Sequence, residues 1–121
     1  METQWITEQN RSFVECLPDG GLITSEQDAL DLVGICGEHR TFALLLHETN
    51  LNEDFYDLRT GLAGAVLQKL FNYSIRVAAV LPLERSTRGR FGEMVLESNR
   101  GRQFRVFTTR EAAVQWLLSL T

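Results

Sequence analysis

Two predominantly apolar runs stand out in the pattern of hydrophobic and polar positions along the chain. They cover residues 42–46 and 75–81, and neither alternates with polar residues. Strands of this kind are typical of a parallel sheet that is covered by helices on both faces. Between the two runs, apolar residues recur at helical spacing over residues 55–73. The pattern therefore predicts a strand–helix–strand unit with two parallel strands.

Shorter patterns precede this unit. Residues 4–7 and 13–17 predict a β-hairpin that is followed by a turn rich in proline and glycine. A helix is predicted over residues 25–36, because Thr24 and Gln27 have the spacing of a capping box in front of apolar residues at helical spacing.

The remaining elements follow the unit. Residues 82–90 predict a polar loop, residues 91–98 a short helix and residues 104–107 a final strand. Thr108 and Glu111 form a second capping box and begin a closing helix. The apolar face of that helix consists of Ala112, Ala113, Trp116, Leu117 and Leu120.

The predicted order of elements is ββαβαβαβα. It indicates an α/β fold with a mixed five-stranded sheet, in which an N-terminal β-hairpin is followed by three strands joined by right-handed helical crossovers. A chain of 121 residues is long enough for an ordinary core, so we expect a single domain over residues 1–121.

Composition agrees with a soluble globular protein. The chain is 44% hydrophobic and 23% charged, and no apolar run approaches the roughly 18 residues of a membrane helix. The N-terminus lacks the basic and apolar regions of a secretory signal, so we expect a cytoplasmic location without membrane attachment. In that compartment, Cys16 and Cys36 are expected to be buried reduced thiols.

Charge is distributed unevenly. Residues 1–57 carry twelve acids and two bases, whereas residues 58–121 carry four acids and ten bases. Such asymmetry can mark a surface for polyanions, but two oppositely charged halves can also face each other within one fold. No basic run is interleaved with aromatic residues, so nucleic acid is not an expected partner.

Several segments of the chain resemble the bacterial domain of unknown function 4180 family. They are residues 32–40, 45–48, 55–64, 75–82 and 103–107. Together they extend over nearly the whole chain. The resemblance implies a fold but no established activity.

The strand order and the closing helix also resemble STAS domains, the anti-sigma-factor antagonists of the sporulation AA type. In those proteins a Ser or Thr at a helix start is a phosphorylation switch that a kinase-like partner reads. The resemblance implies this role for Thr60, although Leu58-Arg-Thr-Gly61 replaces the usual Asp-Ser-Ser-Gly run. The candidate switch or partner-binding residues are Asp57, Arg59, Thr60, Gly61 and Gly64.

A second candidate site lies at the carboxyl ends of the predicted parallel strands, where α/β sheets bind ligands. His47 and Glu48 follow one strand, and Arg85, Arg88 and Arg90 follow the next. Arginines bind carboxylates and phosphates well, so these residues predict a site for an anionic ligand.

The same region offers an enzyme hypothesis, in which His47 is a general base oriented by Glu48 or Asp57. A metal site would add Glu53 and Asp54, but these acids lack the fixed spacing of a strong metal motif. We therefore expect no metal and no cofactor.

Three functions remain open from the sequence. The first is a non-enzymatic regulatory or protein-interaction module that acts through the helix starting near Asp57. The second is a carrier or sensor of a small anionic or amphipathic ligand, and the third is a hydrolase built on His47. A homodimer is compatible with each of them.

Overall fold

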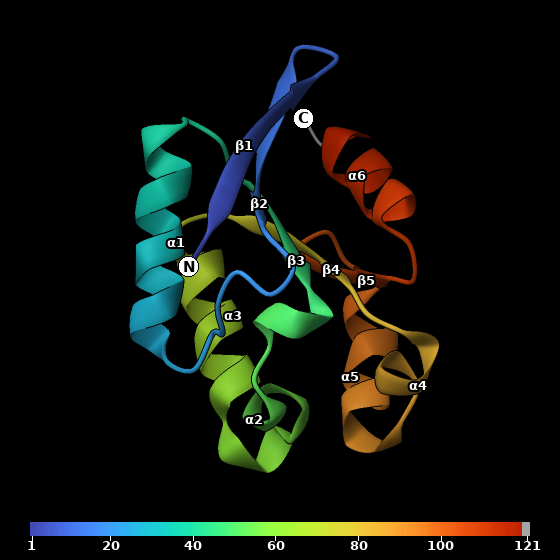
Figure 1. The fold of residues 1–121 in the computed structure, drawn as a ribbon. Coiled ribbons are helices and arrows are strands. Elements are labelled where there is room, and N and C mark those ends of the chain that lie inside the picture. Colours follow the sequence, from blue (N-terminus) through green and yellow to red (C-terminus); the bar gives the residue numbers. More distant parts are fainter. Residues whose placement is uncertain (120–121) are drawn as a thin grey trace.

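The computed structural model describes residues 1–119, which form a mixed five-stranded sheet with helices on both faces (Figure 1). The strands are β1 (Thr3–Glu8), β2 (Arg11–Cys16), β3 (Ala43–His47), β4 (Arg76–Val80) and β5 (Phe104–Phe107). They lie side by side in chain order; β1 pairs antiparallel with β2, and the other neighbours pair parallel. The predicted α/β fold with an N-terminal hairpin at the sheet edge is confirmed.

The helices connect the strands and close the chain. They are α1 (Glu26–Glu38), α2 (Glu53–Tyr56), α3 (Leu62–Asn72), α4 (Leu83–Ser86), α5 (Gly89–Ser98) and α6 (Arg110–Ser119). One residue of the predicted closing helix, Leu120, lies outside the described residues.

The hairpin has a tight turn where residues 9–11 predict one, and the turn is one residue shorter than predicted. Glu8 pairs with Arg11, which leaves Gln9 and Asn10 as a two-residue loop. Both loop residues have positive φ angles, 54° and 63°. This geometry matches the right-handed twist of the strands that it joins.

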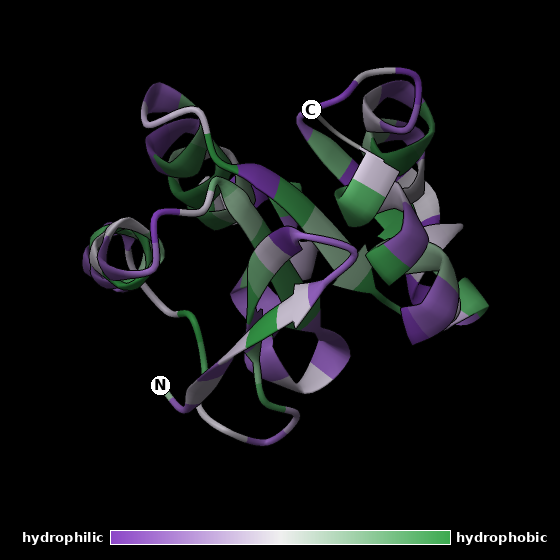
Figure 2. Ribbon diagram, turned by 90° about the horizontal axis from the view of Figure 1, so that it is seen from above, coloured by the Kyte–Doolittle hydropathy of each residue, from purple (hydrophilic) through white to green (hydrophobic). Residues whose placement is uncertain are grey.

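Two layers of core residues lie on opposite faces of the sheet. On one face, α1, α3 and α5 contribute Leu32, Val66 and Val95 to the same buried cluster. On the other face, α6 covers Phe13 and Leu45. Because consecutive parallel strands advance in one direction while their connecting helices stay on one face, the crossovers share one hand. Figure 2 shows hydrophobic colour on the central strands between these layers.

The predicted burial of the two central strands is largely confirmed. Leu44, Leu45 and Leu46 of β3 are fully buried. Phe42, which was predicted to begin this strand, precedes it instead and is 59% exposed.

The prediction of one continuous helix over residues 55–73 is confirmed only for its second part, Leu62–Asn72. The structure has α2, then a 3-10 turn at Leu58–Thr60, and then α3. Asp57 ends α2 and its carboxylate accepts from the backbone N–H of Arg59, while Gly61 adopts a left-handed conformation with φ 78°. A left-handed residue cannot continue a right-handed helix, so α3 starts afresh at Leu62.

The polar loop predicted over residues 82–90 is also wrong in part. Residues Leu83–Ser86 form α4 directly after Pro82, and α5 begins at Gly89. Proline is well tolerated at a helix start because its missing N–H would have no partner there.

At both predicted capping boxes, the residue that caps the helix is the one after the predicted residue. Ser25 rather than Thr24 caps α1, and its hydroxyl accepts from the backbone N–H of Asp28. At α6, the hydroxyl of Thr109 accepts from the backbone N–H of Ala112. The helix predicted to end before Gly37 continues to Glu38.

Cys16 and Cys36 are buried free thiols, as predicted. Burial raises the pKa of each thiol to about 12, so both stay protonated near neutral pH.

Candidate functional site

The carboxyl ends of β3 and β4 open onto a groove beside α2, α4 and α5. Its wider part has a volume of about 510 Å³ and is lined by Tyr56, Asp57, Leu58, Arg59, Arg88, Gly89, Arg90 and Phe91. A narrower part of about 290 Å³ shares three of these residues and adds Glu48, Pro82, Glu84 and Arg85. We call the two parts together the carboxyl-end groove. It brings together Asp57 and Arg59 from the predicted switch with Arg88 and Arg90 from the predicted anion site.

Aromatic rings form the floor of the carboxyl-end groove. The ring centroids of Tyr56 and Phe91 are 5.1 Å apart at an interplanar angle of 65°, and those of Phe55 and Phe91 are 6.2 Å apart. Edge-to-face rings of this kind pack rigidly. Burial raises the pKa of Tyr56 to about 12, so its hydroxyl is neutral near pH 7. The floor is therefore apolar and uncharged.

Arg85 lies over this floor but its charge is already paired. The guanidinium carbon is 4.2 Å from the centroid of the Tyr56 ring. Two carboxylates flank it: Glu53 accepts from Nη1 at 3.0 Å and also from Nη2, and Glu48 accepts from Nε at 3.4 Å. Arg85 thus joins the acidic first half of the chain to its basic second half, as the charge distribution suggested.

Arg88 and Arg90 differ from Arg85. Both side chains are exposed, and no acidic side chain among residues 1–119 forms an ion pair with either. They stand at the start of α5, where unpaired backbone N–H groups add positive potential. Arg59, across the groove, is bound bidentately by Asp57, with two N–O distances of 3.0 Å.

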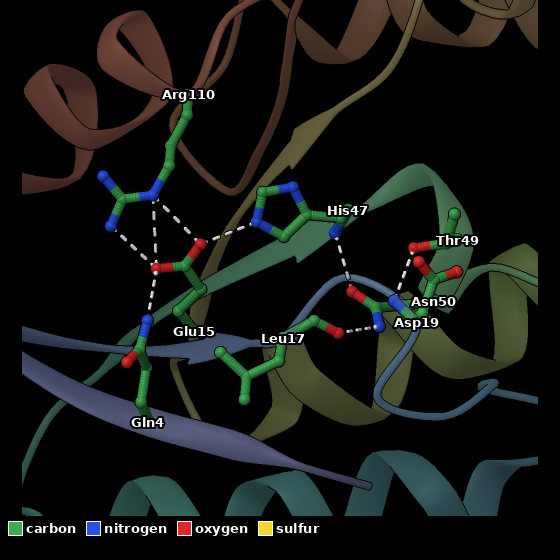
Figure 3. A network of polar contacts seen from close by, with 8 residues as sticks. All are labelled: Gln4, Glu15, Leu17, Asp19, His47, Thr49, Asn50 and Arg110. Carbon is green, nitrogen blue, oxygen red and sulfur yellow. Dashed lines mark hydrogen bonds and ion pairs between the residues drawn. The ribbon is translucent and has the colours of Figure 1, made fainter.

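His47 does not join the carboxyl-end groove, contrary to the sequence prediction. Side chains alternate along β3, so His47 shares the sheet face of Leu45 under α6, while Glu48 lies toward Arg85. Its Nε2 atom is 2.6 Å from Oε2 of Glu15 (Figure 3). Glu48 and Asp57 were predicted to orient His47. Glu48 instead accepts from Arg85, and Asp57 accepts from Arg59.

Glu15 is the centre of a buried polar cluster that the sequence prediction missed. Only 3% of this carboxylate is exposed, yet it accepts from His47, from Gln4 at 3.3 Å and from Arg110. The Arg110 contacts are 2.7 Å from Nη2 to Oε1 and 3.0 Å from Nε to Oε2. Burial alone would raise the pKa of Glu15, but the hydrogen bonds from Arg110 and His47 outweigh it and lower the pKa.

A second set of bonds fixes the loop after His47. The backbone N–H of His47 donates to the side-chain oxygen of Asn50 at 2.8 Å. The Asn50 amide in turn donates to the carbonyl oxygen of Leu17 at 2.9 Å (Figure 3). It also donates to the carbonyl oxygen of Gly21 at 3.2 Å. This fully buried asparagine ties the loop after β3 to the turn after β2.

Thr60 lies outside the lining of the carboxyl-end groove. The sequence predicted that Thr60 lies within a helix, but it lies in the 3-10 turn before α3. Its hydroxyl lies 2.6 Å and 2.9 Å from the backbone carbonyl oxygens of Asp54 and Asp57, to which it donates, and it accepts from the N–H of Leu62 at 3.2 Å. In the unmodified protein this hydroxyl therefore holds the turn together.

The glycines of the predicted partner-binding set are open to solvent. A Cβ atom added at Gly61 or Gly64 would meet no atom within 4 Å. No element of the described chain therefore uses these glycines for a close approach. Among residues 1–119, no group of three or more His, Cys, Asp or Glu side chains is placed to hold a metal ion.

One residue of these sites, Glu15, had a signal in the sequence. Glu15 interrupts an apolar strand, and a charge in such a position must find partners when it is buried. Arg110, its main partner, is ninety-five positions away and carries no local mark. Tyr56 and Phe91 follow apolar patterns, which do not distinguish a groove floor from an ordinary core.

The fold and the groove define a small mixed α/β domain with a basic, aromatic-floored surface at the carboxyl ends of its strands. The sequence profile of the family described as "Domain of unknown function (DUF4180)" matches residues 8–117. The chain belongs to this family, in agreement with the motifs noted above. No curated protein and no solved structure matches the chain significantly. No helix among residues 1–119 is both long and apolar enough to cross a lipid bilayer.

Proposed function

We propose that the protein is a non-enzymatic, cytosolic protein-interaction module that binds an acidic segment of a partner protein in the carboxyl-end groove. The observation that carries this proposal is the pair of exposed guanidinium groups of Arg88 and Arg90, which have no acidic partner among residues 1–119 and lie beside an apolar aromatic floor. Arginine side chains recognise carboxylates bidentately, and aromatic rings supply contact area at low entropic cost.

The groove has two properties that suit a peptide segment. It is continuous, because its two parts share Tyr56, Arg88 and Phe91. Its narrow part is bordered by Glu48 and Glu84, which disfavour an acidic side chain there. We therefore expect the acidic residue to lie near Arg88 and Arg90, and an apolar residue to lie toward Pro82.

A regulatory role is a further part of the proposal. The hairpin-first topology and the closing helix support the STAS-like architecture that the sequence suggested. In this view Thr60 remains the switch, next to Arg59 on the rim of the groove. A phosphate there would break the bonds that its hydroxyl makes to the turn, and its negative charge beside the groove would repel an acidic partner.

The other two functions are less well supported. A small anion would use Arg88 and Arg90 but would leave most of the groove empty. A hydrolase would need His47 and its acids to face substrate, whereas Glu15 and Arg110 occupy the space beside the imidazole, which is largely buried.

Selection of peptides from a displayed random library tests the proposal. The wild-type protein should enrich peptides that combine Asp or Glu with an apolar residue. The double variant Arg88→Glu/Arg90→Glu should bind the enriched peptides at least about tenfold more weakly, because like charges then face each other. A matched control is Arg100→Glu/Arg102→Glu, which reverses two exposed arginines away from the groove and should bind normally.

Two results would contradict the proposal. One is enrichment of peptides without acidic residues. The other is an unchanged affinity in the Arg88→Glu/Arg90→Glu variant, provided that its thermal unfolding matches that of the control variant.

A further inference from the structure

A second hollow lies at the amino ends of the parallel strands, where β3 and β4 begin and where α1 and α3 end. Its volume is about 360 Å³, within the range of small-molecule sites, roughly 300–1,000 Å³. The residues that matter for its chemistry are Val33, Cys36, Arg40, Phe42, Tyr73 and Ile75. We call it the amino-end hollow.

The lining of the amino-end hollow is mostly apolar and ends in two exposed rings. Cys36 and Ile75 are buried and form its base. Phe42 and Tyr73 stand at its mouth, 59% and 51% exposed. Two large apolar side chains that border one hollow and remain open to water favour binding of an apolar body between them.

One cation borders this apolar surface. Arg40 lines the amino-end hollow and is exposed, and no acidic side chain among residues 1–119 forms an ion pair with it. An anion bound here would gain a charge-assisted hydrogen bond without displacing an internal partner.

The backbone conformation of Arg40 is unusual for a residue with a side chain. Arg40 and Ser74 occupy equivalent positions, each just after a helix and just before a strand, with left-handed φ angles of 54° and 63°. The next residue at each site caps the preceding helix. The backbone N–H of Thr41 donates to the carbonyl oxygen of Cys36, and the backbone N–H of Ile75 donates to that of Leu70. Glycine is the unstrained residue at such a position. An arginine here accepts strain that a glycine would avoid.

We propose that the amino-end hollow binds a small amphipathic acid, with a flat apolar body between Phe42 and Tyr73 and a carboxylate on Arg40. The base formed by Cys36 and Ile75 would contact the edge of the apolar body. This site shares no residue with the carboxyl-end groove. The ligand-binding proposal can therefore be tested separately from the protein-interaction proposal.

Binding of naphthalene-2-carboxylate, followed by NMR, tests this assignment. Chemical shifts should change at Phe42, Tyr73 and Ile75 and remain constant at Tyr56 and Phe91. The uncharged naphthalene-2-carboxamide should bind about tenfold more weakly, because it offers no charge to Arg40.

Two glycine variants separate binding from folding. Arg40→Gly removes the guanidinium and relieves the left-handed strain, so the protein should stay folded while the affinity for naphthalene-2-carboxylate falls about tenfold. Ser74→Gly relieves the same strain at the equivalent position and keeps the cation, so its affinity should equal that of the wild type. Phe42→Ala should also lose about tenfold or more.

Three results would overturn the proposal. The first is the absence of shifts around the hollow at millimolar naphthalene-2-carboxylate. The second is equal affinity for the acid and the amide together with an unchanged affinity in Arg40→Gly. The third is a concentration-dependent dimer, seen by analytical ultracentrifugation and lost in Phe42→Ala, which would assign the exposed rings to a second copy of the chain.

Discussion

The guanidinium of Arg110 binds both carboxylate oxygens of Glu15, at 2.7 Å and 3.0 Å, across ninety-five positions of sequence. Glu15 lies on β2 and Arg110 begins α6, so this pair ties the last helix to the second strand. His47 on β3 binds the same carboxylate. One buried charge therefore holds together parts of three elements that the chain builds far apart.

Replacing Arg110 with methionine should lower the free energy of unfolding by about 1–3 kcal/mol, because Glu15 then keeps its buried charge with fewer partners. Urea denaturation at pH 7 measures this difference. Arg102→Met, which changes an exposed arginine elsewhere, should stay within about 0.5 kcal/mol of the wild type. In a Glu15→Gln background the Arg110→Met change should cost less, and equal costs in both backgrounds would mean that the two residues are not coupled.

The same pair predicts a dependence of stability on pH. The pKa of Glu15 is lower in the folded protein than in the unfolded chain, where it lies near the ordinary value of 4.5. The stabilisation by its ionised form is therefore complete above that value and is lost as the pH falls through the folded pKa. Denaturation curves from pH 7 to pH 3 should show a smaller decline for Glu15→Gln than for the wild type. Parallel declines would count against this assignment.

Local patterns predicted the parts of the fold whose causes are local. The apolar runs that became β3 and β4 are fully covered at Leu44 and Val77, and the hairpin follows from short strands around a turn. The break between α2 and α3 was missed because Gly61 also fits a helix whose small residues pack closely. Gly61 takes its left-handed conformation at the end of a turn that Asp57 caps.

Two glycines in helices should respond oppositely to alanine. At Gly64 an added Cβ meets no atom within 4 Å, so Gly64→Ala should stabilise the protein by about 0.5–1 kcal/mol. At Gly92 it would lie 2.5 Å from the carbonyl carbon of Thr87, so Gly92→Ala should destabilise the protein by about 1–3 kcal/mol. Thermal denaturation should therefore show a higher Tm for the first variant and a lower Tm for the second. A lower Tm for Gly64→Ala would reveal a contact at the open face of α3.

Thr60 offers a test of regulation. Thr60→Ala should cost about 0.5–2 kcal/mol, because the turn loses the bonds made by its hydroxyl, and Thr60→Ser should keep most of that stability. Thr60→Asp places a negative charge beside Arg59 and should weaken binding of the selected acidic peptides severalfold. Thr60→Ala should leave peptide affinity unchanged. Equal affinities for the Asp and Ala variants, measured by calorimetry, would rule out the switch.

The candidate site was only half predictable for a physical reason. Residues at the carboxyl ends of parallel strands meet at one end of the sheet, which is why Glu48 and Arg88 could be placed near each other from the order of elements alone. Which sheet face a strand-end residue occupies depends on register, and register put His47 under α6 and away from Arg85. The pairing of Arg85 with Glu48 and Glu53 likewise depends on side-chain positions that no local pattern records.

The placement of α6 has a consequence during protein synthesis. All strands precede this helix in the chain, and within residues 1–119 it is the helix that covers Phe13, Leu45 and Ala78. Consider a nascent chain in which β5 has emerged from the ribosome and residues 110–119 have not. One hydrophobic face of its assembled sheet would be exposed to solvent. Such an intermediate favours self-association, so a translational pause at the stage where β5 has emerged and residues 110–119 have not should be poorly tolerated by the cell.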